Sequence, residues 1–216
     1  MSIVSDLFFI LNGITATISI SFLSFGIGFL LGILLAFIRL YAPKPAALLG
    51  DAYVKLFLGV PVLVFMLLFH FGFGQFIPLF KSAYFSSVFA LGLRSGAYQS
   101  QIFKAAINSI PRDQLLAARA LGLTDSQILR HVVLPQAFIV ALPGLGSEIA
   151  LLIKDSAYAF ILGVLDITKY ADILRAAYRE FVTPYVLAAM LYIVLTFPIA
   201  NYLDKLGSRL KKKYAL

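Results

Sequence analysis

The chain has 216 residues, of which 61% are hydrophobic and 13% are charged, and its formal net charge is +8. A soluble domain usually carries about 25% charged residues, so a water-soluble fold of this size could not cover so much apolar side chain. Cysteine is absent and only two histidines occur, which excludes disulfides and thiolate sites and argues against a histidine-based metal cluster. The composition therefore indicates an integral membrane protein, for which we expect neither a metal site nor a cofactor.

Five stretches are apolar and long enough to cross a hydrocarbon core of about 30 Å. The first stretch follows Asp6, the only charge ahead of it. It is far longer than the apolar part of a cleavable signal peptide, so we expect it to be retained. The sequence predicts an all-α membrane protein with a single transmembrane domain, 1–216, and with spans at about 7–38, 56–80, 82–103, 135–165 and 181–203.

The basic residues predict the orientation, because cytoplasmic loops carry an excess of lysine and arginine. With the C-terminus cytoplasmic and the N-terminus outside, twelve of the 18 basic residues lie inside, four lie outside, and Arg94 and Lys154 fall within spans. The basic residues lie between and after apolar runs rather than among stacking aromatic residues, so we expect no nucleic-acid partner. In the first span, Gly28 and Gly32 form a small-xxx-small pair, for which we favour packing within the chain over a dimer interface.

The loop between the third and fourth spans has the clearest local signals. Pro111 suits a first helical turn and Gly122 suits the turn after a helix, which predicts a short helix at about 112–122. Thr124 and Gln127 have the spacing of a capping box that starts a second helix. Several leucines on this loop need a cover, which membrane, the chain's own core or a partner's groove could each supply.

These residues resemble the cytoplasmic signature of ABC importer permeases, a Glu-Ala-Ala followed by Gly and then Ile-x-Leu-Pro. Here the signature is Ala117 to Gly122 (AARALG), followed after nine residues by Val132 to Pro135 (VVLP). Arg94 to Tyr98 (RSGAY) and Leu152 to Ser156 (LIKDS) are similar to the polar amino acid uptake subfamily, especially its histidine, lysine and arginine permeases. The chain departs from the family at Leu116, which replaces the signature glutamate, at Gln101, and at Arg112-Asp113.

The resemblance implies a type I ABC importer, in which this subunit forms the translocation path and does not itself hydrolyse ATP. No phosphate-binding loop occurs in the chain, which agrees with that division. The expected partners are ATP-binding cassette subunits, an extracytoplasmic solute-binding protein, a second permease copy or a related subunit, and membrane lipid. The predicted helix becomes a coupling helix that meets the ATPase through Leu115, Leu116, Ala117, Ala118, Arg119, Leu121 and Gly122.

Charged side chains inside apolar spans are costly and need partners or a wet cavity. Glu148 and Asp155 are seven residues apart and so share one helix face, on which they could hold a cationic ligand. The resemblance implies that Glu148 selects a basic amino acid, because permeases for such substrates carry an acid at the matching place, whereas Lys154 and Asp155 could be structural. Arg94 could meet a substrate carboxylate, or it could pair with Asp155 or with backbone carbonyls.

Tyr98 and Gln99 complete the predicted substrate-binding set of Glu148, Lys154, Asp155, Tyr98, Gln99 and Arg94. The alternative function is an ion-gradient-driven carrier or channel, which would leave the loop signature unexplained. A membrane enzyme lacks a supporting nucleophile or metal cluster, and a scaffold subunit without a path of its own stays open.

Overall fold

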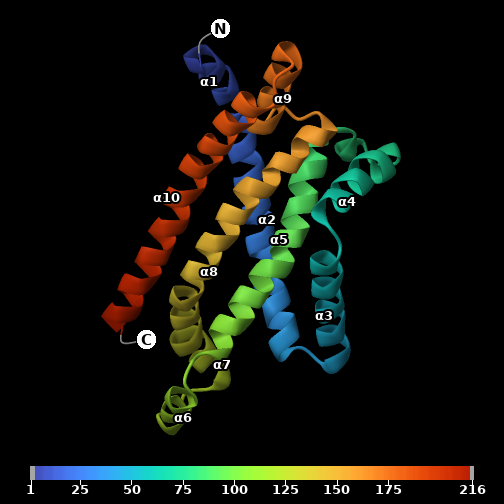
Figure 1. The fold of residues 1–216 in the computed structure, drawn as a ribbon. Coiled ribbons are helices and arrows are strands. Elements are labelled where there is room, and N and C mark those ends of the chain that lie inside the picture. The colour runs from blue at the N-terminus through green and yellow to red at the C-terminus, as the bar shows by residue number, and fades with distance from the viewer. Residues whose placement is uncertain (1–2, 215–216) are drawn as a thin grey trace.

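The computed structural model describes residues 3–214, which form a bundle of long helices with shorter helical segments at both ends (Figure 1). The helices are α1 (Ile3–Leu11), α2 (Ile14–Tyr41), α3 (Lys44–Gly59), α4 (Val62–Leu67), α5 (Ala83–Asn108), α6 (Arg112–Ala120), α7 (Asp125–Ile128), α8 (Leu134–Asp155), α9 (Ile167–Tyr178) and α10 (Val182–Tyr214). Helices α1 and α9 lie at one end of the bundle, and α6, α7 and the C-terminal end of α10 lie at the other (Figure 1). No β-strand occurs among the described residues.

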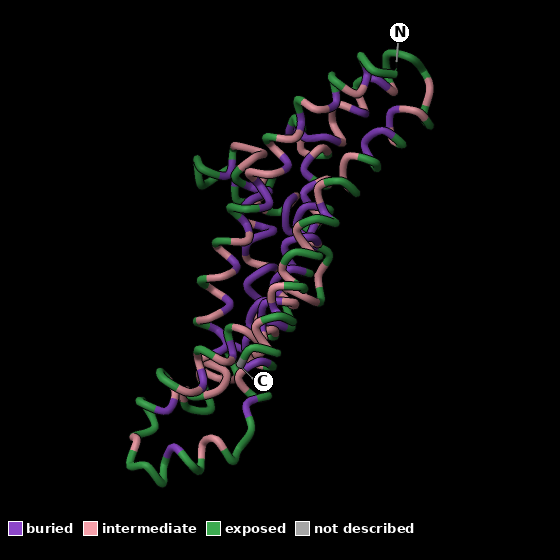
Figure 2. The backbone as a smooth tube through the Cα atoms, turned by 90° about the vertical axis from the view of Figure 1, so that its left-hand side faces the viewer, coloured by how far each residue is buried: buried purple, intermediate pink, exposed green. Residues whose placement is uncertain are grey.

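Helix α5 lies at the centre, where α2 and α8 pack against it and α10 packs against α8. Glycines permit the close approach of α2 and α5, because a Cβ on Gly28 would lie 2.5 Å from Ser95 Oγ and one on Gly32 would lie 2.6 Å from Gln99 Cβ. This contact confirms the predicted packing of the glycine pair within the chain. Figure 2 shows the consequence, a buried stripe along the middle of the bundle with exposed residues at both ends.

The first predicted span consists of two helices, which meet at a turn at Asn12 and Gly13. A Cβ on Gly13 would lie 2.3 Å from the backbone of Asp166 and Ile167, so only glycine allows this approach. The turn therefore fits the N-terminal end of α2 against the start of α9, and α1 continues beyond it.

The second predicted span is broken. Helices α3 and α4 meet at an angle of 98°, because Pro61 provides no backbone N–H and Val60 before it is extended, at φ −105° and ψ 134°. The chain then continues as a π-helical turn, Leu68–Gly72, and two 3-10 turns, Phe73–Gln75 and Pro78–Lys81. Arg39 holds α3 against the bundle through Asp51, at 2.6 Å, and also donates to Ser100 on α5, at 3.1 Å.

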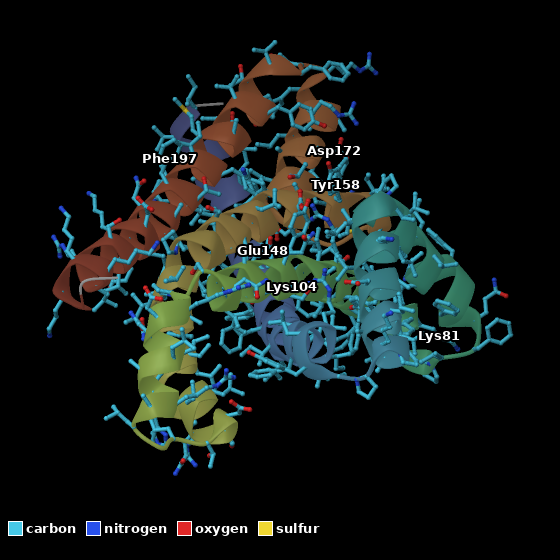
Figure 3. The ribbon with its side chains drawn as sticks, turned by 90° about the horizontal axis from the view of Figure 1, so that it is seen from below. Lys81, Lys104, Glu148, Tyr158, Asp172 and Phe197 are labelled. Atoms are coloured by element: carbon cyan, nitrogen blue, oxygen red, sulfur yellow. The ribbon has the colours of Figure 1, made fainter. Side chains whose placement is uncertain are left out.

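Three helical segments of the described chain are long and apolar enough to cross a membrane, namely Ile3–Tyr41, Asp125–Leu162 and Val182–Lys213, and the bent α3–α4 pair adds a fourth. Helix α5 falls outside this set because its sequence is more polar, although it has 26 residues. Helix α8 is preceded by a π-helical turn, Leu129–Val133, and followed by a 3-10 helix, Ser156–Leu162. Helix α10 extends beyond the predicted span into the basic C-terminal segment, and Phe197 is exposed on its outer flank (Figure 3).

Candidate functional site

A cavity of about 480 Å³ opens beside the bend between α3 and α4. The bend supplies one wall, and the opposite wall comes from α5 and from the end of α8 with the 3-10 helix after it. The lining residues are Leu58, Gly59, Val60, Pro61, Val62, Leu63, Arg94, Tyr98, Asp155 and Tyr158. The helix break at Pro61 therefore supplies one wall of the site, and Arg94, Tyr98, Asp155 and Tyr158 face it across the cavity.

Arg94 and Asp155 form an ion pair across this cavity wall. Their side chains keep 15% and 14% of their surface exposed, so the pair is mostly desolvated and yet reachable from the cavity. The Arg94 guanidinium also lies 4.9 Å from the centre of the Tyr98 ring, a distance at which cation–π attraction operates. The structure thus has the Arg94–Asp155 pairing, one of the alternatives that the sequence left open.

Glu148 lies two helical turns before Asp155 on α8 and is only 3% exposed. It is not among the residues that line the cavity, although Arg94, Ser95 and Asp155 are close enough to act on its carboxylate. One of its carboxylate oxygens, Oε1, has no hydrogen-bond partner within residues 3–214. Figure 3 places Glu148 on α8 within the bundle. The site therefore has a paired carboxylate at the cavity and a second carboxylate without a paired base behind it.

The other two predicted substrate residues lie apart from the cavity. Gln99 is fully buried between α5 and α2, where its Nε2 donates to Phe25 O at 3.1 Å and to Ser95 Oγ at 3.0 Å. Lys154 is exposed and does not line the cavity. Of the six predicted residues, the cavity brings together Arg94, Tyr98 and Asp155.

Sequence reasoning missed Tyr158 and the residues of the bend, from Leu58 to Leu63. Their signal was Gly59-Val-Pro61 inside an apolar run, which marks a helix break, and broken helices often line transport sites. The described part of the chain has no group of three or more residues that could hold a metal ion.

The predicted coupling helix corresponds to α6 and the turn after it. The turn uses Gly122 at φ +78°, and Thr124 and Gln127 form the predicted capping box. Arg119 reaches across the turn to Asp125 at 3.1 Å. The turn glycine, the capping box and this ion pair, all formed by residues close in sequence, therefore determine the connection between α6 and α7.

The leucines of this segment divide into two groups. Leu115 and Leu123 pack with Ala118 on a small core that includes Ile110 and Val133. By contrast, Leu116 is 60% exposed and Leu121 is 82% exposed, and Ala117 is exposed as well. The outer surface of α6 and of the turn after it therefore offers two leucines, Leu116 and Leu121, that no part of the described chain covers.

At the opposite end, Asp166 is fully buried and caps α9 by accepting from the Lys169 backbone N–H at 2.7 Å. Burial raises the pKa of the Asp166 carboxyl to about 7, and the bond from Lys169 opposes this shift. On the surface of α9, the Arg175 guanidinium donates to Asp172 at 2.8 Å and lowers the pKa of that carboxyl. Asp172 is labelled in Figure 3.

Comparisons with known proteins identify the family. The profile of the binding-protein-dependent transport system inner membrane component matches residues 28–212. The arginine transport system permease protein ArtQ of Bacillus subtilis (strain 168) is 32% identical over 201 residues, which cover 93% of this chain and 91% of ArtQ. The probable glutamine ABC transporter permease protein GlnM of the same organism is 32% identical over 207 residues, which cover 94% of each protein.

Two solved structures share the fold. A crystal structure of an amino acid ABC transporter with histidines has a TM-score of 0.86 and 33% identity, and the match covers 93% of this chain and 94% of that one. An inward-facing structure of the MetNI methionine ABC transporter has a TM-score of 0.79 at 20% identity, covering 94% of this chain and 96% of that one. The fold is that of a type I ABC importer permease.

Permeases of this family work in the inner membrane with ATP-binding subunits and solute-binding proteins, and ATP is hydrolysed on a separate subunit. ATP-driven import is therefore favoured over the ion-gradient-driven alternative. The chain belongs to the binding-protein-dependent transport system inner membrane component family, as a permease subunit of an ABC importer for amino acids.

Proposed function

We propose that this permease subunit carries basic amino acids, and that the cavity at the α3–α4 bend and Glu148 behind it hold the substrate. The observation that carries the proposal is the charge balance of the site. Arg94 neutralises Asp155, whereas Glu148 has a carboxylate oxygen without a hydrogen-bond partner in the described chain. An ionised Glu148 leaves one negative charge, which complements the single positive charge of arginine or lysine.

The relatives support an amino acid substrate and give two candidates. ArtQ is named for arginine, and one similar structure is described as holding histidines, whereas GlnM is named for glutamine. A neutral substrate such as glutamine is the second candidate, and it would require Glu148 to be protonated or satisfied by water. Buried carboxylates can hold a proton in apolar surroundings, so the state of Glu148 separates the two candidates.

The proposed orientation has five membrane crossings, with α5 as the third. In it, the N-terminus lies outside and α6, α7 and the C-terminus lie in the cytoplasm. The positions of these segments at opposite ends of the bundle support it (Figure 1), as does the basic end of α10, which carries Lys211, Lys212 and Lys213. The exposed apolar flank of α10 would contact lipid, and a second permease copy or a related subunit would complete the path.

Coupling to ATP would pass through α6. Exposed Leu116 and Leu121 would insert into the ATPase subunit, while Leu115 and Ala118 would connect α6 to the π-helical turn Leu129–Val133, which leads directly into α8. Closure of the ATPase subunits would then move the core-bound side of α6 together with the membrane helices. Such a mechanism requires contacts that differ between the inward- and outward-facing states.

The test is uptake by proteoliposomes that contain the permease, its ATPase and its binding protein. We expect wild-type vesicles to accumulate arginine and lysine in preference to glutamine. In the Glu148→Gln variant, we expect the ratio of arginine uptake to glutamine uptake to fall at least tenfold. Glu180→Gln is the matched control, because it removes the same charge at the start of α10, where Glu180 accepts from the Val182 N–H. A Glu148→Gln variant with the wild-type arginine-to-glutamine ratio would refute the proposed specificity.

A further inference from the structure

A second cavity, of about 310 Å³, lies where α6 begins, and we call it the basal cavity. Its walls come from residues 109–111 before α6, from Gln114 on α6, from Gln136 and Val140 on α8, and from Lys211 on α10. It shares no residue with the cavity at the α3–α4 bend. Its volume is at the lower end of the range for small-ligand sites, about 300–1,000 Å³, so it suits a compact polar group.

Close packing of α10 on α8 brings Lys211 to the basal cavity. A Cβ on Gly207 would lie 2.8 Å from Pro143 Cδ, so the two helices touch at this point. Lys211 follows Gly207 by one helical turn and lies on the same face of α10, which places it beside Val140 at the cavity. Within residues 3–214, no carboxylate pairs with Lys211, and no Asp or Glu is among the cavity walls. The basal cavity is therefore positively charged.

Two glutamines form the rest of its polar wall. Gln136 Nε2 donates to Gln114 Oε1 at 2.7 Å and to Val132 O at 3.0 Å, which ties the start of α8 to α6. Gln136 Oε1 is buried and accepts no hydrogen bond from the described residues, and a buried acceptor without a donor is costly. A ligand that fits the basal cavity therefore brings a negative charge for Lys211 and a hydrogen-bond donor for Gln136.

The basal cavity lies at the membrane surface in the proposed orientation. Gln136 lies at the start of the fourth predicted span, 135–165, whereas Lys211 lies about two helical turns beyond the end of the fifth, 181–203. The segment with α6 and the C-terminal end of α10 share one end of the bundle (Figure 1). This is the level at which hydrocarbon gives way to lipid headgroups, and basic pockets between membrane helices at the cytoplasmic surface bind anionic headgroups.

We propose that the basal cavity binds the headgroup of an anionic phospholipid, with its phosphate at the Lys211 ammonium and a headgroup hydroxyl donating to Gln136 Oε1. Phosphatidylglycerol carries both groups. Phosphatidylcholine has no net negative charge and no hydroxyl donor, so it satisfies neither residue. The apolar walls of Ile110, Pro111 and Val140 contact the glycerol backbone of the lipid, which is less polar than the headgroup.

A lipid bound in this way joins three helices. It holds α10 through Lys211 and α8 through Gln136, and Gln136 is bonded to Gln114 on α6. The headgroup therefore stiffens the junction between α6 and the membrane helices, and substrate-stimulated ATP hydrolysis depends on anionic lipid. This consequence rests on the proposed coupling through α6. The binding of the headgroup does not, and neither depends on which amino acid is carried.

The experiment measures equilibrium binding of short-chain phosphatidylglycerol and phosphatidylcholine to the purified permease–ATPase complex. We expect the wild type to prefer phosphatidylglycerol by about fivefold, the effect of one lysine near an anionic membrane surface. Lys211→Gln should abolish this preference, whereas Lys211→Arg, which keeps the charge, should retain it. Lys212→Gln is the matched control and should also retain it, because Lys212 is exposed and is not among the cavity walls.

An unchanged preference in Lys211→Gln would overturn the site. Phosphatidylmethanol has the charge without the hydroxyl and should bind the wild type more weakly than phosphatidylglycerol; equal affinities would overturn the contact with Gln136. If inorganic phosphate displaces phosphatidylglycerol as effectively as the lipid itself, the basal cavity holds a soluble anion and no lipid. If Lys211→Gln weakens association with the ATPase and leaves the lipid preference intact, an acidic group of the ATPase occupies the basal cavity instead.

The role in coupling is measured in lipid nanodiscs. Adding phosphatidylglycerol to phosphatidylcholine nanodiscs should raise substrate-stimulated ATP hydrolysis by the wild type more than by Lys211→Gln. Equal increases would overturn that role. The proposed amino acid specificity is tested separately by the uptake ratio of Glu148→Gln, so its failure and the failure of the lipid site are distinguishable.

Discussion

The exposed leucine at the end of α6 gives the sharpest test of coupling. Leu121 is 82% exposed, and full burial of a leucine side chain contributes about 1.5–3 kcal/mol. If Leu121 inserts into the ATPase subunit, Leu121→Ala removes most of this burial free energy from the association, about 1–2 kcal/mol. That loss corresponds to an association constant lower by a factor of about 5–30.

The assay titrates the ATPase subunit onto permease variants in lipid nanodiscs and then measures ATP hydrolysis stimulated by substrate and binding protein. Leu30→Ala is the matched control, because Leu30 on α2 is 73% exposed in the membrane part of the bundle. Leu121→Ala should weaken association and lower the stimulated hydrolysis at a fixed ATPase concentration, whereas Leu30→Ala should leave both unchanged. If the two variants bind the ATPase within twofold of each other, the outer face of α6 is not the docking surface.

Two further predictions concern stability. Gly28→Ala should lower the Tm of the purified chain, because its Cβ would lie 2.5 Å from Ser95 Oγ and overpacking of this kind costs about 1–3 kcal/mol. Gly26→Ala is the control, because a Cβ there would have no atom within 4 Å, and it should leave the Tm unchanged or raise it. Equal Tm values for the two variants would contradict the packing argument. Asp166 has a folded-state pKa of about 7, above its ordinary 3.8, so the folded chain holds this proton more tightly and stability should fall as the pH rises from about 4 to 7. The Tm should therefore be lower at pH 8 than at pH 5, and Asp166→Asn should reduce that difference; an unchanged difference would show that other groups cause it.

Local geometry was the part of the structure most accessible from sequence. The turn at Gly122 and the capping box of Thr124 and Gln127 depend on residues within a few positions of each other, so their conformations follow from backbone sterics and short hydrogen bonds. The helix break at Pro61 has a local cause of the same kind, because proline lacks a backbone N–H and Val60 before it is extended. Its angle of 98° does not follow from local sequence, because that depends on how α4 packs against α5.

Packing partners decide what the sequence left undetermined. Leu115 and Leu116 are chemically identical neighbours, about 100° apart on a helix, and nothing local indicates which one faces the core. Ile110 and Val133 resolve this, because they form the surface on which Leu115 lies. Similarly, Lys154 and Asp155 are adjacent, but only Asp155 reaches Arg94 on another helix.

Helix α5 is too polar to be recognised as a membrane span by hydropathy, yet it lies at the centre of the bundle and lines the cavity. A span that faces lipid must be apolar, but α5 packs between α2 and α8. Its side chains therefore contact protein rather than hydrocarbon, and they can be polar. Gly28 and Gly32 of α2 leave room for Ser95 and Gln99 in the interior. Asp155 of α8 neutralises the charge of Arg94. The polar residues that lower the hydropathy of α5 thus either pack against α2, as Ser95 and Gln99 do, or line the cavity, as Arg94 and Tyr98 do.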